Sequence, residues 1–138
     1  MTEMNNMVST WDIFCKYILE YAAKEADAAI ILKDSFAAFD ALNDIPKNKI
    51  LKLTSDDAMI LAAAGLAVSG KKTWIISESS AITSTGYGQI REAVAIPSLP
   101  VRIVVAETGL CKGQDGVGRN ILEDTSLMRA LPNMSVFI

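Results

Sequence analysis

Residues 49–70 read KILKLTSDDAMILAAAGLAVSG, and this stretch contains the pattern that decides the fold. Its first part, residues 50–53, predicts a short apolar strand. The helix that follows has a body, residues 58–67, made almost entirely of small and apolar side chains. A helix that is apolar all round is predicted to be buried. Gly70 is the residue type that commonly follows a helix end, so the helix is expected to stop there.

Two carboxylates, Asp56 and Asp57, lie at the junction between this strand and this helix. In a parallel sheet, ligands bind outside the carboxyl ends of the strands, so one interpretation is a binding site. The other interpretation is structural, because Ser55 is a good N-cap and acidic residues in a first turn suit the helix dipole. The residues alone leave both interpretations open.

Apolar runs of strand length alternate with helical periodicity along the whole chain. The runs lack polar alternation, which is typical of strands buried on both faces. The pattern therefore predicts an α/β fold, with a largely parallel sheet of about five strands and helices on both faces. Strands are expected at residues 28–32, 50–53, 73–77, 101–105 and 134–138, helices at 10–24 (capped by Thr10), 56–68, 89–95 and 121–131, and a short helix or a loop at 35–43.

The size of the chain, 138 residues, fits a single domain, in which residues 1–9 are expected to form a flexible leader. The chain is 51% hydrophobic, rich enough that some apolar surface is expected to contact a partner. No apolar run approaches the roughly 20 residues of a membrane span, and no signal peptide is visible. We therefore expect a cytoplasmic protein that does not enter a membrane.

Charge and residue counts exclude several classes of function. The net charge of −3 offers no basic surface for nucleic acid. The chain has no histidine, which removes histidine-based triads and most zinc sites, so no metal site is expected in this chain. The two isolated cysteines, Cys15 and Cys111, fit a reducing compartment. Cys111 is interpreted as an ordinary loop thiol, because no histidine can activate it.

A second candidate site is the glycine-rich loop GQDGVG at residues 113–118. It lacks the lysine of a P-loop and the tight turn of a dinucleotide fingerprint. It is either a flexible surface loop or a set of backbone N–H groups that line a pocket, with Arg119 near an anion. Asp34 follows another strand, so the loops at Asp34, Asp56 and residues 107–119 are expected to meet at one edge of the sheet.

Three segments together resemble a known family: AAAGLAVSGKKTWII at residues 62–76, QIREAVAIPSLPVRIVVAETGL at 89–110, and GQDGVGRNILEDTSLMRALPNMSV at 113–136. Their order and spacing resemble the pyrimidine-binding domain of the transketolases, as found in transketolase and deoxyxylulose phosphate synthase. The most specific parts are residues 63–67 and 122–133. The resemblance is strong over residues 49–138 and weaker over 10–40.

The resemblance implies a thiamine diphosphate site shared between two domains. In the family, the pyrimidine-binding domain supplies a carboxylate to the aminopyrimidine ring, and a separate domain holds the diphosphate and magnesium. Carried over residue by residue, this assigns the proton-relay acid to Asp56 and a substrate contact to Arg119. The resemblance assigns coenzyme contacts to Asp34, Asp57, Ser80, Tyr87, Asp115 and Gly116.

The sequence departs from the family pattern at the implied site. The family's glutamate-glutamine pair reads Asp56-Asp57 here, and the missing methylene shortens the reach of the acid by about 1.5 Å. Small residues at 78–82 replace the aromatic residues that pack on the pyrimidine, which leaves Tyr87 nearby, and Arg119 replaces a histidine. Relative to the family, the chain is expected to be truncated at its C-terminus.

Two hypotheses follow from the resemblance. The first is a subunit of a split transketolase-like enzyme, which transfers a ketol unit between sugar phosphates only when a partner chain supplies the diphosphate and magnesium site. The second is a non-catalytic subunit kept for assembly or binding. In both, we expect a homo- or hetero-oligomer with residues 56–68 in the contact, and we expect a large side chain at Gly65 to break the fold and the contact together.

Overall fold

The computed structural model describes residues 9–34, 41–78, 81–111, 113–116 and 120–138. Within this part of the chain, four strands form one sheet in the order β2-β1-β3-β4, and every neighbouring pair is parallel. The predicted α/β class and parallel sheet are therefore confirmed. The strands are β1 (Ala28–Lys33), β2 (Ile50–Leu53), β3 (Lys72–Glu78) and β4 (Val101–Ala106).

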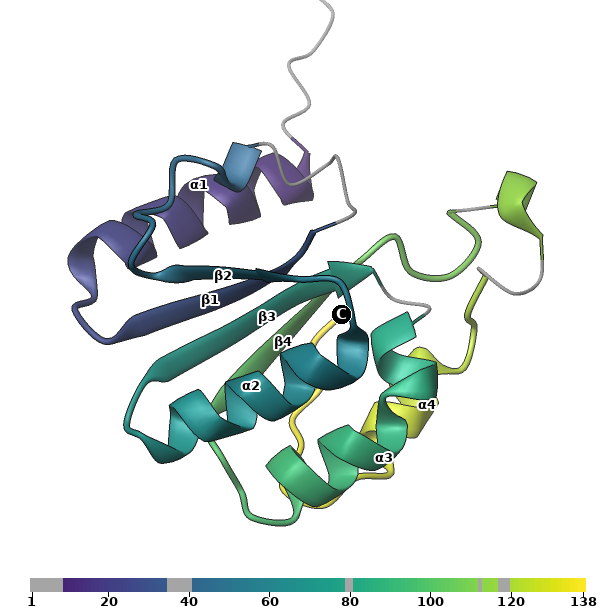
Figure 1. Ribbon diagram of the computed structural model, residues 1–138. Helices are drawn as coiled ribbons and strands as arrows, with labels where there is room; N and C mark the ends of the chain where they lie inside the picture. Colours follow the sequence, from purple (N-terminus) through teal and green to yellow (C-terminus); the bar gives the residue numbers. More distant parts are fainter. Residues whose placement is uncertain (1–8, 35–40, 79–80, 112, 117–119) are drawn as a thin grey trace, which may run out of the picture.

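Helices cover both faces of this sheet (Figure 1). One face packs against α1 (Thr10–Lys24), and the other packs against α2 (Asp56–Val68) and the later helical segments. A short α3 (Tyr87–Gln89) continues directly into a π-helical turn, η3 (Ile90–Ala95), near the expected helix at 89–95. The remaining helical segments are the π-helical η2 (Ala81–Thr85), the 3₁₀ turn η4 (Gly113–Asp115) and α4 (Asp124–Arg129).

The central strands are apolar on both sides because both sides are covered. Along β1, Ile31 packs in the cluster under α2, whereas Ile30 and Leu32 pack in the cluster under α1. The next strand repeats the alternation, with Ile75 on the first side and Ile76 on the second. This two-sided burial is the physical reason for the absence of polar alternation in the sequence.

The chain reverses its direction of winding across the sheet at β1. From β1 it moves outward to the neighbouring strand β2, and from β2 it returns through α2 to β3, on the other side of β1. A crevice outside the carboxyl ends of the strands, at such a switch point, is the usual ligand site of an open α/β sheet. Here the switch point lies where β1 and β3 end.

The expected fifth strand at residues 134–138 is wrong. This segment pairs with none of the described strands, although Met134 and Val136 pack against the core cluster under α2. Phe137 and Ile138 are 92% and 100% exposed. A strand needs a neighbour for its backbone hydrogen bonds, and an apolar alternation in the sequence does not supply one.

The helix ends differ from the prediction at two places and agree with it at a third. The N-cap of α1 is Ser9, whose hydroxyl accepts a hydrogen bond from Trp11 N–H, and not Thr10. The helix expected at 121–131 is shorter, and Leu122, which lies before its first residue, is 70% exposed. Gly70 does follow the end of α2, with a φ of 88° that favours glycine.

Helix α2 is buried on one side only, so the expectation of burial all round is wrong. Met59, Ile60 and Ala63 face the core, whereas Leu61 and Val68 are 55% and 74% exposed. The outer side of α2 is therefore an uncovered apolar face within the described chain. No described helix is long and apolar enough to cross a bilayer.

The two glycines on and beside α2 differ in their surroundings. A Cβ built on Gly65 meets nothing within 4 Å, so the expected damage to the fold from a side chain at Gly65 is not supported. A Cβ built on Gly86 would lie 2.6 Å from both Ile60 Cδ1 and the Ile82 carbonyl oxygen. The close packing predicted for Gly65 is found at Gly86.

Candidate functional site

Asp56 is the first residue of α2, immediately after the strand end of β2. Ser55 is the N-cap, and its hydroxyl accepts a hydrogen bond from Ala58 N–H at 3.4 Å. The structural interpretation of this helix start is therefore correct for Ser55. The Asp56 side chain points into the protein, and only 13% of it is exposed, so it is not an ordinary surface acid of a first helical turn.

Two side chains hold the Asp56 carboxylate. The Lys33 ammonium lies 2.5 Å from Oδ2, and the Ser77 hydroxyl donates to Oδ1 at 3.1 Å. The Lys33 side chain is 14% exposed, and Ser77 is fully buried. Lys33 ends β1 and Ser77 lies near the end of β3, so the three residues meet at the switch point of the sheet.

Sequence reasoning missed Lys33 and Ser77, and it chose Asp34 as the polar residue after β1. The Asp34 and Asp57 side chains are exposed, in contrast to the mostly buried side chain of Asp56. The sequence did contain a signal for Lys33. This lysine ends the apolar strand β1, and the neighbouring parallel strand β2 is followed closely by Asp56. The pairing of β1 with β2, which sets Lys33 opposite Leu53, was needed to use that signal.

The other predicted site residues are only partly described. Tyr87 is half-buried and packs against the core cluster under α2. Gly116 is exposed, has a φ of 78°, and its carbonyl accepts a hydrogen bond from the Asn120 amide at 2.9 Å. The backbone of Asp115 ends η4, but its side chain lies outside the described part. Ser80 and Arg119 lie outside the described residues.

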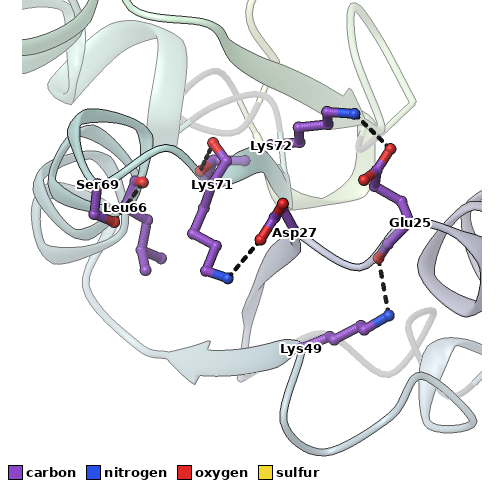
Figure 2. A network of polar contacts seen from close by, with 8 residues as sticks. Glu25, Asp27, Lys49, Leu66, Ser69, Lys71 and Lys72 are labelled. Carbon is purple, nitrogen blue, oxygen red and sulfur yellow. Dashed lines mark hydrogen bonds and ion pairs between the residues drawn. The ribbon is translucent and has the colours of Figure 1, made fainter.

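A second polar cluster lies at the opposite edge of the sheet, where the strands begin (Figure 2). Lys72 contacts Glu25 at 2.6 Å, and Lys71 contacts Asp27 at 2.9 Å. Lys49 donates to the Glu25 carbonyl at 2.8 Å. The Lys72 hydrogen bond lowers the pKa of Glu25, and Lys71 likewise lowers the pKa of Asp27. These groups are exposed or half-buried, and we interpret them as structural.

Comparison with known proteins gives the chain relatives but no family model, since none matches. It is 40% identical over 82 residues to a putative transketolase C-terminal section of Methanocaldococcus jannaschii, which covers 59% of this chain and 26% of that protein. It is 23% identical to an apulose-4-phosphate transketolase subunit of Phocaeicola vulgatus over 97% of this chain and 44% of that protein. Further relatives are named 1-deoxy-D-xylulose-5-phosphate synthases.

A solved structure described as a split gene transketolase, inactive beta4 tetramer, matches with a TM-score of 0.74. The match covers 87% of this chain and 39% of that chain at 22% identity, so it shows the shared fold. Together these similarities support a relationship between this chain and the transketolase family. The chain spans only 26% of the length of the Methanocaldococcus protein and 44% of that of the Phocaeicola protein.

The residues at this edge do not fit the aminopyrimidine of thiamine diphosphate as they are arranged. Asp56 has the right charge and lies at the right edge, but Lys33 and Ser77 each occupy one of its two oxygens. Its side chain is also one methylene shorter than the glutamate of the family, which shortens its reach by about 1.5 Å. Each carboxylate oxygen therefore already has a partner inside the chain, and the acid extends less far toward a ligand.

Proposed function

We propose that this chain is the pyrimidine-side subunit of a two-component transketolase-like assembly. A partner chain carries the diphosphate and magnesium site, and the assembly transfers a ketol unit between sugar phosphates. The observation that carries the proposal is the mostly buried Asp56 carboxylate at the head of α2, at the switch point of a parallel sheet. Relatives named as a transketolase section and a transketolase subunit support the two-component arrangement.

In this assembly, Asp56 is the residue of the chain that lies on the aminopyrimidine side. Asp34, Asp57, Ser80, Tyr87, Asp115, Gly116 and, toward substrate, Arg119 remain its proposed neighbours. The proposal places the diphosphate side of the site on a partner chain, so we expect no transketolase turnover from these 138 residues alone supplied with coenzyme and magnesium.

A specific observation favours a second candidate function, a subunit kept for assembly without coenzyme chemistry. Both oxygens of Asp56 are engaged by side chains of the same chain. A carboxylate that is already paired and hydrogen-bonded has no need of an external partner. The two candidate functions share the fold and the partner. They differ only in whether the Asp56 carboxylate is released from Lys33 and Ser77 to contact the coenzyme.

The outer face of α2 is the proposed surface for the partner. Leu61 and Val68 are exposed on it, and Gly65 between them lets another backbone approach closely. No charged residue follows Asp57 within this helix. An uncovered apolar helix face of this kind is typical of an interface.

The test is co-expression with a diphosphate-binding transketolase subunit, followed by sedimentation. Leu61→Asp should weaken the association at least about tenfold, because it buries an unpaired charge in the interface. Ile13→Asp is the matched control, since Ile13 is 59% exposed on α1, on the other side of the sheet, and Leu61 is 55% exposed. Equal effects of the two substitutions, with both variants folded by circular dichroism, would contradict the proposed surface.

A further inference from the structure

We infer that Lys33 is an internal counter-ion that keeps the acid site of this subunit closed to a coenzyme. The inference rests on the second candidate function proposed above, a subunit kept for assembly without coenzyme chemistry, because it concerns the acid that the first candidate places on the aminopyrimidine side. It assigns to Lys33 and Ser77 a role that decides which ligand the edge of the sheet can accept.

The contacts leave the carboxylate little freedom to meet a ligand. Lys33 Nζ lies 2.5 Å from Oδ2 of Asp56, and Ser77 Oγ lies 3.1 Å from Oδ1. Lys33 is fixed by the end of β1, Asp56 by the start of α2 and Ser77 by β3. Since all three come from regular elements of the core, the arrangement is preorganised.

The surroundings make the pair hard to open. Only 14% of the Lys33 side chain and 13% of the Asp56 side chain are exposed, so water offers each charge little compensation. Removing one partner from such a pair leaves the other as an uncompensated charge, which is strongly unfavourable. The aminopyrimidine ring is neutral and cannot replace the ammonium as a counter-ion, so a ring that displaced Lys33 would leave a buried charge uncompensated.

The chain contains an exposed pair of the same composition that serves as a control. Lys71 and Asp27 lie 2.9 Å apart, and their side chains are 42% and 58% exposed. Exposed pairs of this kind contribute little, because water solvates both charges when they separate. The two pairs therefore compare a mostly buried aspartate–lysine contact with an exposed one.

The first test is a double-mutant cycle on the lone chain, with the folding equilibrium constant measured by urea denaturation. We expect Lys33→Met and Asp56→Asn each to lower that constant about 30-fold, between the effects typical of buried and of surface pairs. The double variant should lose far less than the product of the two. The same cycle on Lys71→Met and Asp27→Asn should show effects of about threefold or less. A coupling at Lys33–Asp56 no larger than at Lys71–Asp27 would overturn the inference.

The second test works even if a variant fails to fold, because it uses the unmodified chain. Acetylation by a limiting amine reagent, followed by mass spectrometry, should label Lys33 at least about tenfold more slowly than Lys71, since amines react only when free and accessible. This protection should persist when thiamine diphosphate and magnesium are added. Labelling of Lys33 as fast as Lys71, before or after this addition, would overturn the inference. Both tests use the lone chain, so failure of the partner experiment does not affect them.

Discussion

The two edges of the sheet carry the same charged groups in different surroundings. At the amino edge, Glu25 and Lys72 lie 2.6 Å apart, with 26% and 53% of their side chains exposed (Figure 2). At the carboxyl edge, Asp56 and Lys33 lie 2.5 Å apart, with 13% and 14% exposed. The distances hardly differ, whereas the exposed fraction of the acid is twice as large at the amino edge and that of the lysine is almost four times as large.

This difference shows that the burial of the charged side chains, and not the contact distance, distinguishes the candidate site from the structural cluster. At the amino edge, water can replace either partner of an ion pair. The contacts there connect the starts of the strands, and the loss of one of them costs little stability. At the carboxyl edge, each charge depends on the other and on Ser77. Among the described residues, the least exposed ion pair therefore lies at the switch point of the sheet, where the family resemblance also points.

The largest expected effect in this comparison comes from two serines that each donate one hydrogen bond. Ser77 is fully buried and donates to the Asp56 carboxylate, and Ser69 is exposed and donates to the Leu66 carbonyl at 2.8 Å. We expect Ser77→Ala to cost about 2 kcal/mol, as for hydrogen bonds to charged groups. Ser69→Ala should cost a few tenths, about 0.5 kcal/mol at most. Urea denaturation of both variants measures the difference, and equal costs would show that the carboxyl edge is as well solvated as the amino edge.

An intermediate effect is expected at Lys49, a half-buried cation of the amino edge cluster. Its ammonium donates to the Ala22 and Glu25 carbonyls, at 2.7 and 2.8 Å, where α1 ends. A cation at a helix C-terminus satisfies carbonyls that have no partner within the helix, so Lys49→Met should cost about 1 kcal/mol.

Lys52→Met is the control for Lys49→Met. Lys52 donates to the Asn43 amide oxygen at 2.9 Å in an exposed position. We expect its loss to change the free energy of unfolding by about 0.5 kcal/mol or less. Thermal unfolding followed by circular dichroism compares the two, and a larger effect at Lys52 would show that the contacts at the end of α1 do not stabilise it.

The sequence predicted those features that depend on neighbouring residues. Ser55 followed by two acids marked the start of α2, and Gly70 marked its end. Two-sided burial of β1 and β3 followed from their unbroken apolar runs, whereas the outer strands β2 and β4 are only partly buried. These signals act over a few residues, so they could be interpreted without knowing which elements are neighbours.

The features that depend on distant neighbours could not be predicted in the same way. The segment 134–138 has the composition of a strand but no described strand to pair with. Lys33 contacts Asp56 only because β1 and β2 are parallel neighbours. The sequence does not distinguish Gly65 from Gly86, yet only at Gly86 would an added Cβ meet Ile60. In each case the missing information is the position of an element elsewhere in the chain.

The smallest expected effect is a pH dependence of stability at the amino edge. The hydrogen bond from Lys72 holds the pKa of Glu25 below its ordinary value, so the unfolded chain binds the proton more readily. The contribution of Glu25 is therefore present above the ordinary carboxyl pKa and is lost as the pH falls through the lowered one. Glu25 in turn raises the pKa of Lys72, so the contribution of Lys72 is present below the ordinary lysine pKa and is lost as the pH rises through the raised one.

Lys72→Met should weaken the pH dependence of stability on the acidic side and on the alkaline side, which are its two limbs. The Lys72 ammonium both lowers the pKa of Glu25 and has a raised pKa of its own, so its removal abolishes both shifts. Urea midpoints measured at neutral, acidic and alkaline pH give the two limbs, and about 1 M salt should reduce them in the unmodified chain by screening. Lys24→Met is the control, because Lys24 lies 3.6 Å from Glu20 in a pair whose side chains are 79% and 56% exposed. If Lys72→Met leaves the acid limb unchanged, Glu25 does not depend on Lys72. Glu25 and Lys72 would then lack even the weak coupling that their short contact suggests. The difference in coupling between this pair and Lys33–Asp56 would be larger than their difference in burial implies.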